Sequence, residues 1–114
     1  MNFDQQKAQK IWQTVCLIPA GKVSSYGLIA DLAGLPGRAR MVGRVLQFAP
    51  QSMQIPWFRV VKSNGQIAFA PGSGFARRQI ELLRPEGVEV RNNRVRMKRY
   101  GWSPQLGELL QMKF

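Results

Sequence analysis

The chain contains no histidine and only a single cysteine among its 114 residues. The absence of histidine excludes Cys/His catalysis and nearly every zinc site, so we expect neither a metal nor another cofactor. A lone cysteine cannot form an internal disulfide. Because Cys16 follows Val15, near the apolar stripe of a helix that the residue spacing predicts, we expect a small buried thiol with a structural role rather than a nucleophile.

Long hydrophobic runs, internal repeats and low-complexity tracts are also missing. No apolar segment approaches the length of a membrane span, and Met1 is followed by Asn2, Phe3 and Asp4 rather than by a basic and then apolar signal region. The sequence has no phosphate-binding glycine loop either. We therefore expect one domain over residues 1–114, located in the cytosol and without a membrane partner.

Acidic residues are scarce relative to basic ones. Lys and Arg number 17 against 6 Asp and Glu, which gives a net charge of +11, and the isoelectric point is near 11.2. So large an excess in a short chain favours a polyanionic partner, nucleic acid before a membrane surface, and predicts association with the nucleoid. Solubility alone rarely requires such an imbalance.

Hydrophobic periodicity predicts several helices. Residues 4–17 carry apolar residues at helical spacing, and Asp4 is a fair N-cap. Ser25 can cap a helix over residues 26–33, and after a Gly/Pro turn a second helix runs from about 38 to 48. Two short helices joined by such a turn are typical of a helix-turn-helix, here over about residues 25–48. The second helix directs Val42, Val45 and Leu46 inward and Arg38, Arg40 and Arg44 outward.

Ala39 and Gly43 lie four residues apart, so they share a helix face that is almost bare of side chains. One interpretation is tight packing against another helix. The other is a helix laid into a narrow groove of DNA, where large side chains would not fit.

Turn signals predict two hairpins. Asn64-Gly65 predicts a hairpin over residues 59–69, and Asn92-Asn93 predicts another over 88–97. Between them, Ser73 can cap a helix over about 75–84. The second hairpin begins a basic segment, residues 88–114, that ends in a weak helix or tail from Leu106 to Phe114. Its charges can simply solvate an edge pair of strands, and they are Arg91, Arg94, Arg96, Lys98 and Arg99.

The segment 55–61, IPWFRVV, places an arginine among large apolar residues directly after a proline. Pro56 restricts the backbone, so Trp57 leaves a stiff turn on a defined vector. Val60 and Val61 then predict the start of a buried strand. Arg59 needs a carboxylate or backbone carbonyls as partners in such surroundings.

Four segments, in the same order, resemble the C-terminal domain of the DNA alkylguanine alkyltransferases. They are IPAGKVSSYG (18–27), ARMVG (39–43), IPWFRVV (55–61) and LLRPEGV (82–88). The resemblance runs from Ile18 to about Val90, roughly two-thirds of the length of the chain. The resemblance implies a mainly α fold with short β-hairpins, a winged helix-turn-helix-like single domain that acts as a monomer.

Trp57 stands where that family has its nucleophilic cysteine, and Phe58 stands where it has histidine. Without these reacting groups the chain resembles the alkyltransferase-like proteins, a branch that binds alkylated guanine without repairing it and marks the lesion for nucleotide excision repair. The segment Tyr100-Gly101-Trp102 after a basic hairpin strengthens this resemblance. It implies a non-enzymatic protein whose partners are duplex DNA containing O6-alkylguanine and nucleotide excision repair proteins.

The resemblance also implies individual roles. Tyr26 would crowd the phosphate 3′ to the lesion and help rotate the nucleotide out, while Arg40 would fill the vacated space in the base stack. Trp57 would line the lesion pocket together with Tyr26, Phe69, Ala70 and Pro71. The DNA-binding residues would be Tyr26, Arg38, Ala39, Arg40, Gly43 and Arg44.

Departures from the family pattern refine this expectation. Ala49 replaces the family asparagine, and the loop of Phe69, Ala70 and Pro71 is smaller and less polar, which suggests a roomier pocket that tolerates bulky alkyl groups. Glu86 lacks the histidine it would orient, so a structural pairing with Arg59 or another arginine is favoured over a catalytic role.

Two other functions remain open at this point. One is a helix-turn-helix regulator that reads undamaged DNA in the major groove through Arg38, Arg40 and Arg44. The other is an enzyme, either a glycosylase or an alkyltransferase that uses Cys16. A reader of base damage has a physical reason to extrude the base, because a base inside a duplex cannot be inspected on all sides.

Overall fold

The computed structural model describes residues 4–104, and its first helix is α1 (Gln5–Cys16). Asp4 caps it as predicted, since its carboxylate accepts hydrogen bonds from the backbone N–H groups of Gln6 and Lys7 at 2.9 and 3.2 Å. The apolar stripe Ala8, Ile11, Trp12 and Val15 is buried.

Cys16 corrects the prediction of a buried thiol, because its side chain is exposed. It comes one residue after the buried Val15, and that step of about 100° around the helix carries it off the stripe. Partial burial still raises the pKa of the thiol, which makes it a weaker nucleophile at neutral pH.

The predicted helix-turn-helix is present as α2 (Tyr26–Leu32) and α3 (Ala39–Leu46). Ser25 caps α2, with its Oγ accepting from the Leu28 N–H at 3.0 Å. Val42 and Val45 of α3 are fully buried, Leu46 is half-buried and the three arginines are exposed. The Trp12 indole N–H donates to the Val45 carbonyl at 2.8 Å, so a buried hydrogen bond joins α1 to α3.

The first predicted hairpin is wrong. Its turn forms, with the Lys62 N–H donating to the Gln66 carbonyl at 2.9 Å, but β2 (Val60–Val61) pairs in parallel with β1 (Ser24–Ser25). The chain after the turn joins the C-terminal hairpin instead, where the Ile67 N–H donates to the Asn93 carbonyl at 2.8 Å. Both valines are fully buried, and parallel pairs are typically buried on both faces.

The C-terminal third contains α4 (Gly74–Leu83), which Ser73 caps, and the predicted second hairpin, β3 (Val90–Arg91) and β4 (Arg94–Val95). Asn92 and Asn93 both have positive φ, 51° and 62°, as a type I′ turn requires. Lys98 and Arg99 lie not on this hairpin but on the short helix α5 (Met97–Tyr100). Single 3-10 turns span Gln51–Met53 (η1), Trp57–Arg59 (η2) and Arg84–Glu86 (η3).

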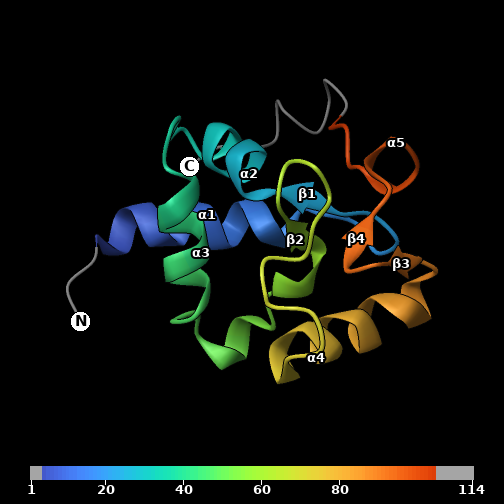
Figure 1. The fold of residues 1–114 in the computed structure, drawn as a ribbon. Coiled ribbons are helices and arrows are strands. Elements are labelled where there is room, and N and C mark those ends of the chain that lie inside the picture. The colour runs from blue at the N-terminus through green and yellow to red at the C-terminus, as the bar shows by residue number, and fades with distance from the viewer. Residues whose placement is uncertain (1–3, 105–114) are drawn as a thin grey trace.

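In Figure 1, β2 lies between α3 on one side and β3 and β4 on the other, and its two residues belong to two different hydrophobic clusters. Val60 belongs to the cluster around α1, α2 and α3, while Val61 belongs to the cluster around α4 and the C-terminal hairpin. This division follows from the strand period of two, because successive side chains point to opposite faces. Tyr100 and Trp102 are buried, one in each cluster.

Two expectations concern the membrane and the tail. Within residues 4–104, no helix is both long and apolar enough to cross a membrane. The predicted helix or tail from Leu106 to Phe114 lies outside the described residues.

Candidate nucleic-acid interface

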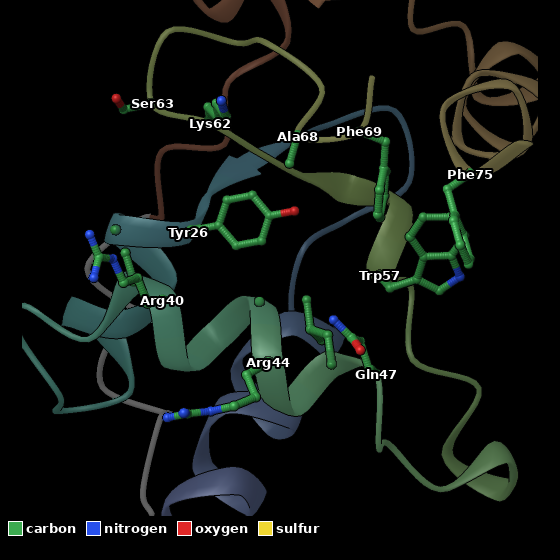
Figure 2. Close-up of a pocket in the computed structure, with 14 residues that line it drawn as sticks. Tyr26, Arg40, Arg44, Gln47, Trp57, Lys62, Ser63, Ala68, Phe69 and Phe75 are labelled. Atoms are coloured by element: carbon green, nitrogen blue, oxygen red, sulfur yellow. The ribbon is translucent and has the colours of Figure 1, made fainter. Parts of the chain in front are cut away.

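An open cavity of about 940 Å³ lies between the helix-turn-helix and the start of α4 (Figure 2). It is lined by residues from α2, α3, η2, the loop after β2 and the first turn of α4. The lining residues are Tyr26, Gly27, Ala39, Arg40, Gly43, Arg44, Leu46, Gln47, Trp57, Lys62, Ser63, Ala68, Phe69 and Phe75.

The small residues of α3 form one side of this cavity and also support Tyr26. Ala39 and Gly43 both line it, and a Cβ built at Gly43 would lie 3.7 Å from the Tyr26 ring. The bare face therefore lies beside a side chain of the preceding helix, and its fit into a groove of DNA stays a prediction. In Figure 2 the Tyr26 hydroxyl points toward the wall that carries Trp57 and Phe69.

Tyr26 keeps its proton at neutral pH. Burial raises the pKa of its phenol, so the hydroxyl remains available as a hydrogen-bond donor.

Three aromatic rings form the opposite wall. The Trp57 and Phe69 rings meet edge to face with centroids 6.3 Å apart, and Phe69 stacks on Phe75 at 5.2 Å. Phe75 is 68% exposed, more than the other large exposed apolar side chains within residues 4–104, Leu17 and Phe48. The wall therefore offers apolar ring surface to a ligand from the depth of the cavity to its rim.

The lesion pocket predicted from the sequence is only partly assembled here. Tyr26, Trp57 and Phe69 line the cavity, whereas Ala70 and Pro71 are exposed and do not. The Asn93 side chain donates to the Phe69 carbonyl at 2.9 Å and anchors that residue, after which the chain turns toward α4.

Sequence reasoning missed Ala68 and Phe75. The available signal for Phe75 was a large apolar residue two positions after a helix cap, where a first-turn side chain is commonly exposed.

Basic side chains border the cavity, and no acidic residue of the described part of the chain lines it. Arg40, Arg44 and Lys62 contribute to the lining, while Arg38 is exposed and lies outside it. Figure 2 shows the Arg40 and Arg44 guanidinium groups pointing away from the aromatic wall. An anionic ligand with an apolar, planar part would match this combination of charges and rings.

A half-buried ion pair fixes the segment that carries Trp57. Arg59 Nη2 and Nε lie 2.5 and 3.0 Å from the two Glu86 oxygens, and Arg59 Nη1 donates to the Ile18 carbonyl at 2.8 Å. The Gly21 N–H donates to Glu86 at 3.0 Å. The predicted pairing of Glu86 with Arg59 is therefore confirmed.

The charge state of Glu86 follows from these contacts. Burial alone would raise the pKa of its carboxyl group, but the hydrogen bonds from Arg59 and Gly21 and the charge of Arg59 outweigh burial and lower it. Glu86 is thus an ionised structural partner at neutral pH.

A buried amide completes this support. Gln79 of α4 is 1% exposed, and its Nε2 donates to the carbonyls of Phe58 and Val60 at 2.9 and 3.1 Å. The sequence analysis missed it, because an isolated glutamine on a helix is normally a surface residue.

Among residues 4–104, no cysteine, histidine, aspartate or glutamate lines the cavity. Cys16, the only cysteine in the chain, lies at the end of α1 and does not line the cavity. The cavity therefore offers planar apolar surface, hydrogen-bond donors and positive charge, and the hydroxyl of Ser63 and the amine of Lys62 in its lining have no histidine or carboxylate beside them there to act as a base.

Comparisons with known proteins agree with this geometry. Residues 6–88 match the family model for the DNA-binding domain of 6-O-methylguanine DNA methyltransferase. The chain is 41% identical over 96 residues to a DNA base-flipping protein of Vibrio parahaemolyticus, covering 83% of this chain and 94% of that one. It is 37% identical over 100 residues to alkyltransferase-like protein 1 of Schizosaccharomyces pombe, covering 83% and 93%.

The fold is similar to that of a solved relative. The crystal structure of Schizosaccharomyces pombe Atl1 in complex with damaged DNA containing O6-carboxymethylguanine superimposes with a TM-score of 0.79 at 36% identity, over 91% of this chain and 100% of that one. The expected fold class, a mainly helical single domain with short strands, is confirmed.

Proposed function

This chain belongs to the alkyltransferase-like family, and we propose that it binds duplex DNA containing O6-alkylguanine by rotating the damaged nucleotide into its cavity, without transferring the alkyl group. The observation that carries this proposal is the cavity itself. It joins the exposed face of a helix-turn-helix to an aromatic wall, is bordered by cations and has no cysteine or histidine in its described lining.

The size and lining of the cavity suit an extruded base. Its volume of about 940 Å³ lies within the range of small-molecule sites. Trp57 and Phe69 supply planar apolar surface, and base–aromatic stacking contributes roughly 1–3 kcal/mol per base. A base held there gains contacts that offset the few kcal/mol lost when it leaves the stack, a cost that is smaller for a lesion that pairs badly.

The face of α3 suits close approach to a duplex. Ala39 and Gly43 place no long side chain between the helix backbone and the open side of the cavity. Arg38, Arg40 and Arg44 surround that face with positive charge, which favours phosphates. We assign these five residues to DNA binding.

Tyr26 and Arg40 carry the extrusion step in this proposal. The Tyr26 ring lies half-buried beside Gly43, at a position where it can crowd a phosphate. Arg40 has no ion-pair partner among residues 4–104, which leaves its planar guanidinium available to fill the gap in the base stack.

The proposal includes a downstream role. A protein that holds a flipped, unrepaired lesion marks it for other proteins, and we assign the protein to nucleotide excision repair on the nucleoid in the cytoplasm. Its support is the family membership together with a cavity whose described lining has no cysteine or histidine.

The test compares two duplexes of one sequence, with guanine or O6-methylguanine at the centre, by fluorescence anisotropy. We expect tighter binding to the lesion, and an increase in signal from a fluorescent base analogue placed at the flipping position. A sequence preference on undamaged DNA without preference for the lesion would instead support the helix-turn-helix regulator. A methyl group found on the protein by mass spectrometry would contradict the non-enzymatic assignment.

A further inference from the structure

A second group of cations lies outside the cavity, and we call it the hairpin basic surface. It consists of Lys22, Arg84, Arg91, Arg94, Arg96 and Arg99. None of these residues lines the cavity. In Figure 1, β3, β4 and α5 lie on one side of the β1–β2 pair, and α3 lies on the other. The recognition helix and the hairpin basic surface thus occupy separate regions of the molecule.

Contacts join five of these cations in two groups, Arg91 with Arg94 and both Lys22 and Arg84 with Arg99. Arg91 and Arg94 are direct partners across the hairpin. Arg84 and Arg99 line the same hollow of about 450 Å³. The Lys22 ammonium donates to the Arg99 carbonyl at 3.4 Å, which connects the segment before β1 to α5.

The surface carries uncompensated charge. Like charges directly opposite each other in a hairpin are destabilising, yet Arg91 and Arg94 occupy such positions. Glu89 pairs with Arg91, and no other member of the surface has an ion-pair partner within residues 4–104. A polyanion bound here would relieve that repulsion, so the arrangement favours an anionic partner over plain solvation.

The chemistry of the surface distinguishes phosphates from an acidic protein. Five of the six cations are arginines, whose planar fork matches phosphate oxygens in bidentate geometry. Protein interfaces depend on buried aromatic or aliphatic anchors. The large apolar side chains exposed within residues 4–104 are Leu17, Phe48 and Phe75, and none belongs to this surface or its elements.

We propose that the hairpin basic surface binds the phosphate backbone of a second segment of duplex DNA, independently of any lesion. The binding would be non-specific in sequence, because the surface presents charge without groups arranged to read base edges. Its consequence is that one protein molecule can hold a damaged site and a neighbouring duplex at the same time. The proposal does not depend on lesion recognition by the cavity.

The test is a two-duplex capture experiment. A duplex containing O6-methylguanine is immobilised and loaded with the native protein, and a fluorescent undamaged duplex is then added at low salt. We expect the fluorescent duplex to be retained. In Arg94→Gln/Arg99→Gln its retention should fall about tenfold, and the logarithmic salt dependence of capture should weaken by about two ions, while affinity for the immobilised lesion stays unchanged.

A matched double variant controls for the loss of two charges. Lys7→Gln/Lys10→Gln removes the same charge from α1 and should capture as the native protein does. If the hairpin variant unfolds, as judged by circular dichroism, Arg91→Gln/Arg96→Gln replaces it. Equal capture by the hairpin and α1 variants overturns the proposal, as does no capture by native protein that is shown to be retained on the immobilised duplex. Arg40→Ala separates the two sites, because it should weaken lesion preference and leave binding of the undamaged duplex by the hairpin intact.

Discussion

Replacing Glu86 by glutamine should destabilise the domain more than any substitution of an exposed acidic residue. The Glu86 carboxylate accepts two hydrogen bonds from Arg59 and one from the Gly21 N–H, and the side chains of the pair are only 16% and 15% exposed. Glutamine is of similar size but offers one acceptor and no charge, so the Arg59 guanidinium would remain largely desolvated without its counterion.

The magnitude follows from that desolvation. Removing one partner of a fully buried pair costs about 3–5 kcal/mol, and the residual exposure of this pair lowers our expectation to about 2–3 kcal/mol. For a domain of this size such a loss corresponds to a decrease in melting temperature of roughly 10–20 °C. Urea denaturation followed by tryptophan fluorescence measures it as a shift of the midpoint at constant slope.

The same residue makes stability depend on pH. Because the pKa of Glu86 is lowered in the folded state, its contribution is fully present above the unfolded pKa, and it is lost as pH falls through the folded value. Native protein should therefore lose stability below about pH 5, while Glu86→Gln should show a flatter profile.

The control is an exposed pair. Glu81 lies 3.7 Å from Arg78 with both side chains more than 60% exposed, so Glu81→Gln should change stability by less than about 0.5 kcal/mol. If Glu86→Gln were as mild as Glu81→Gln, or retained the native pH profile, the Arg59–Glu86 pair would not be what fixes this segment.

The remaining predictions concern the cavity. Phe75→Ala should leave the free energy of unfolding within about 1 kcal/mol of the native value, because the side chain is exposed. It should weaken binding to O6-benzylguanine several-fold more than binding to O6-methylguanine, since only an aromatic substituent can stack on Phe69 and Phe75 at the rim. Equal losses of affinity for the two lesions would exclude a contact at the rim. Arg40→Ala should weaken lesion binding more than Arg91→Ala, and an unchanged extrusion signal in both Arg40→Ala and Tyr26→Phe would refute their assignment. Trp57→Cys alone should not yield an efficient alkyltransferase, because a thiol near pKa 8.5 is only a few per cent ionised at neutral pH and Phe58 provides no base. The measurement is single-turnover methyl transfer from a DNA lesion. Transfer by Trp57→Cys as fast as by Trp57→Cys/Phe58→His would show that the base is dispensable.

Local signals in the sequence predicted local structure well. Asp4, Ser25 and Ser73 cap the helices that they were expected to cap, and Asn92-Asn93 forms the expected turn. Each of these outcomes depends on a side chain and a backbone within a few residues of it. The fold class and the pairing of Glu86 with Arg59 were also foreseen, through four separated segments that match one family.

The errors occur where partners are distant in sequence. Asn64-Gly65 specified a turn but not the strand beside it, because Val60 and Val61 reach burial on both faces only against Ser24 and Ser25. Ala70 and Pro71 were assigned to the pocket from the family resemblance, but both are exposed and neither lines the cavity, while Asn93 anchors the preceding Phe69. Neither contact has a sequence signature that spacing or composition can detect.

Trp57 owes its position to the residues that flank it rather than to deep burial of its own side chain. Gln79 holds the Phe58 and Val60 carbonyls from one side, and Glu86 holds Arg59 from another, while Trp57 itself stays half-exposed on the cavity wall. A binding site gains selectivity when its surfaces are ordered before the ligand arrives. Ordering them on binding would cost free energy comparable to the small difference in binding free energy between a lesion and a normal base. The buried polar contacts behind Trp57 therefore fix its side chain in the orientation that recognition of the base requires.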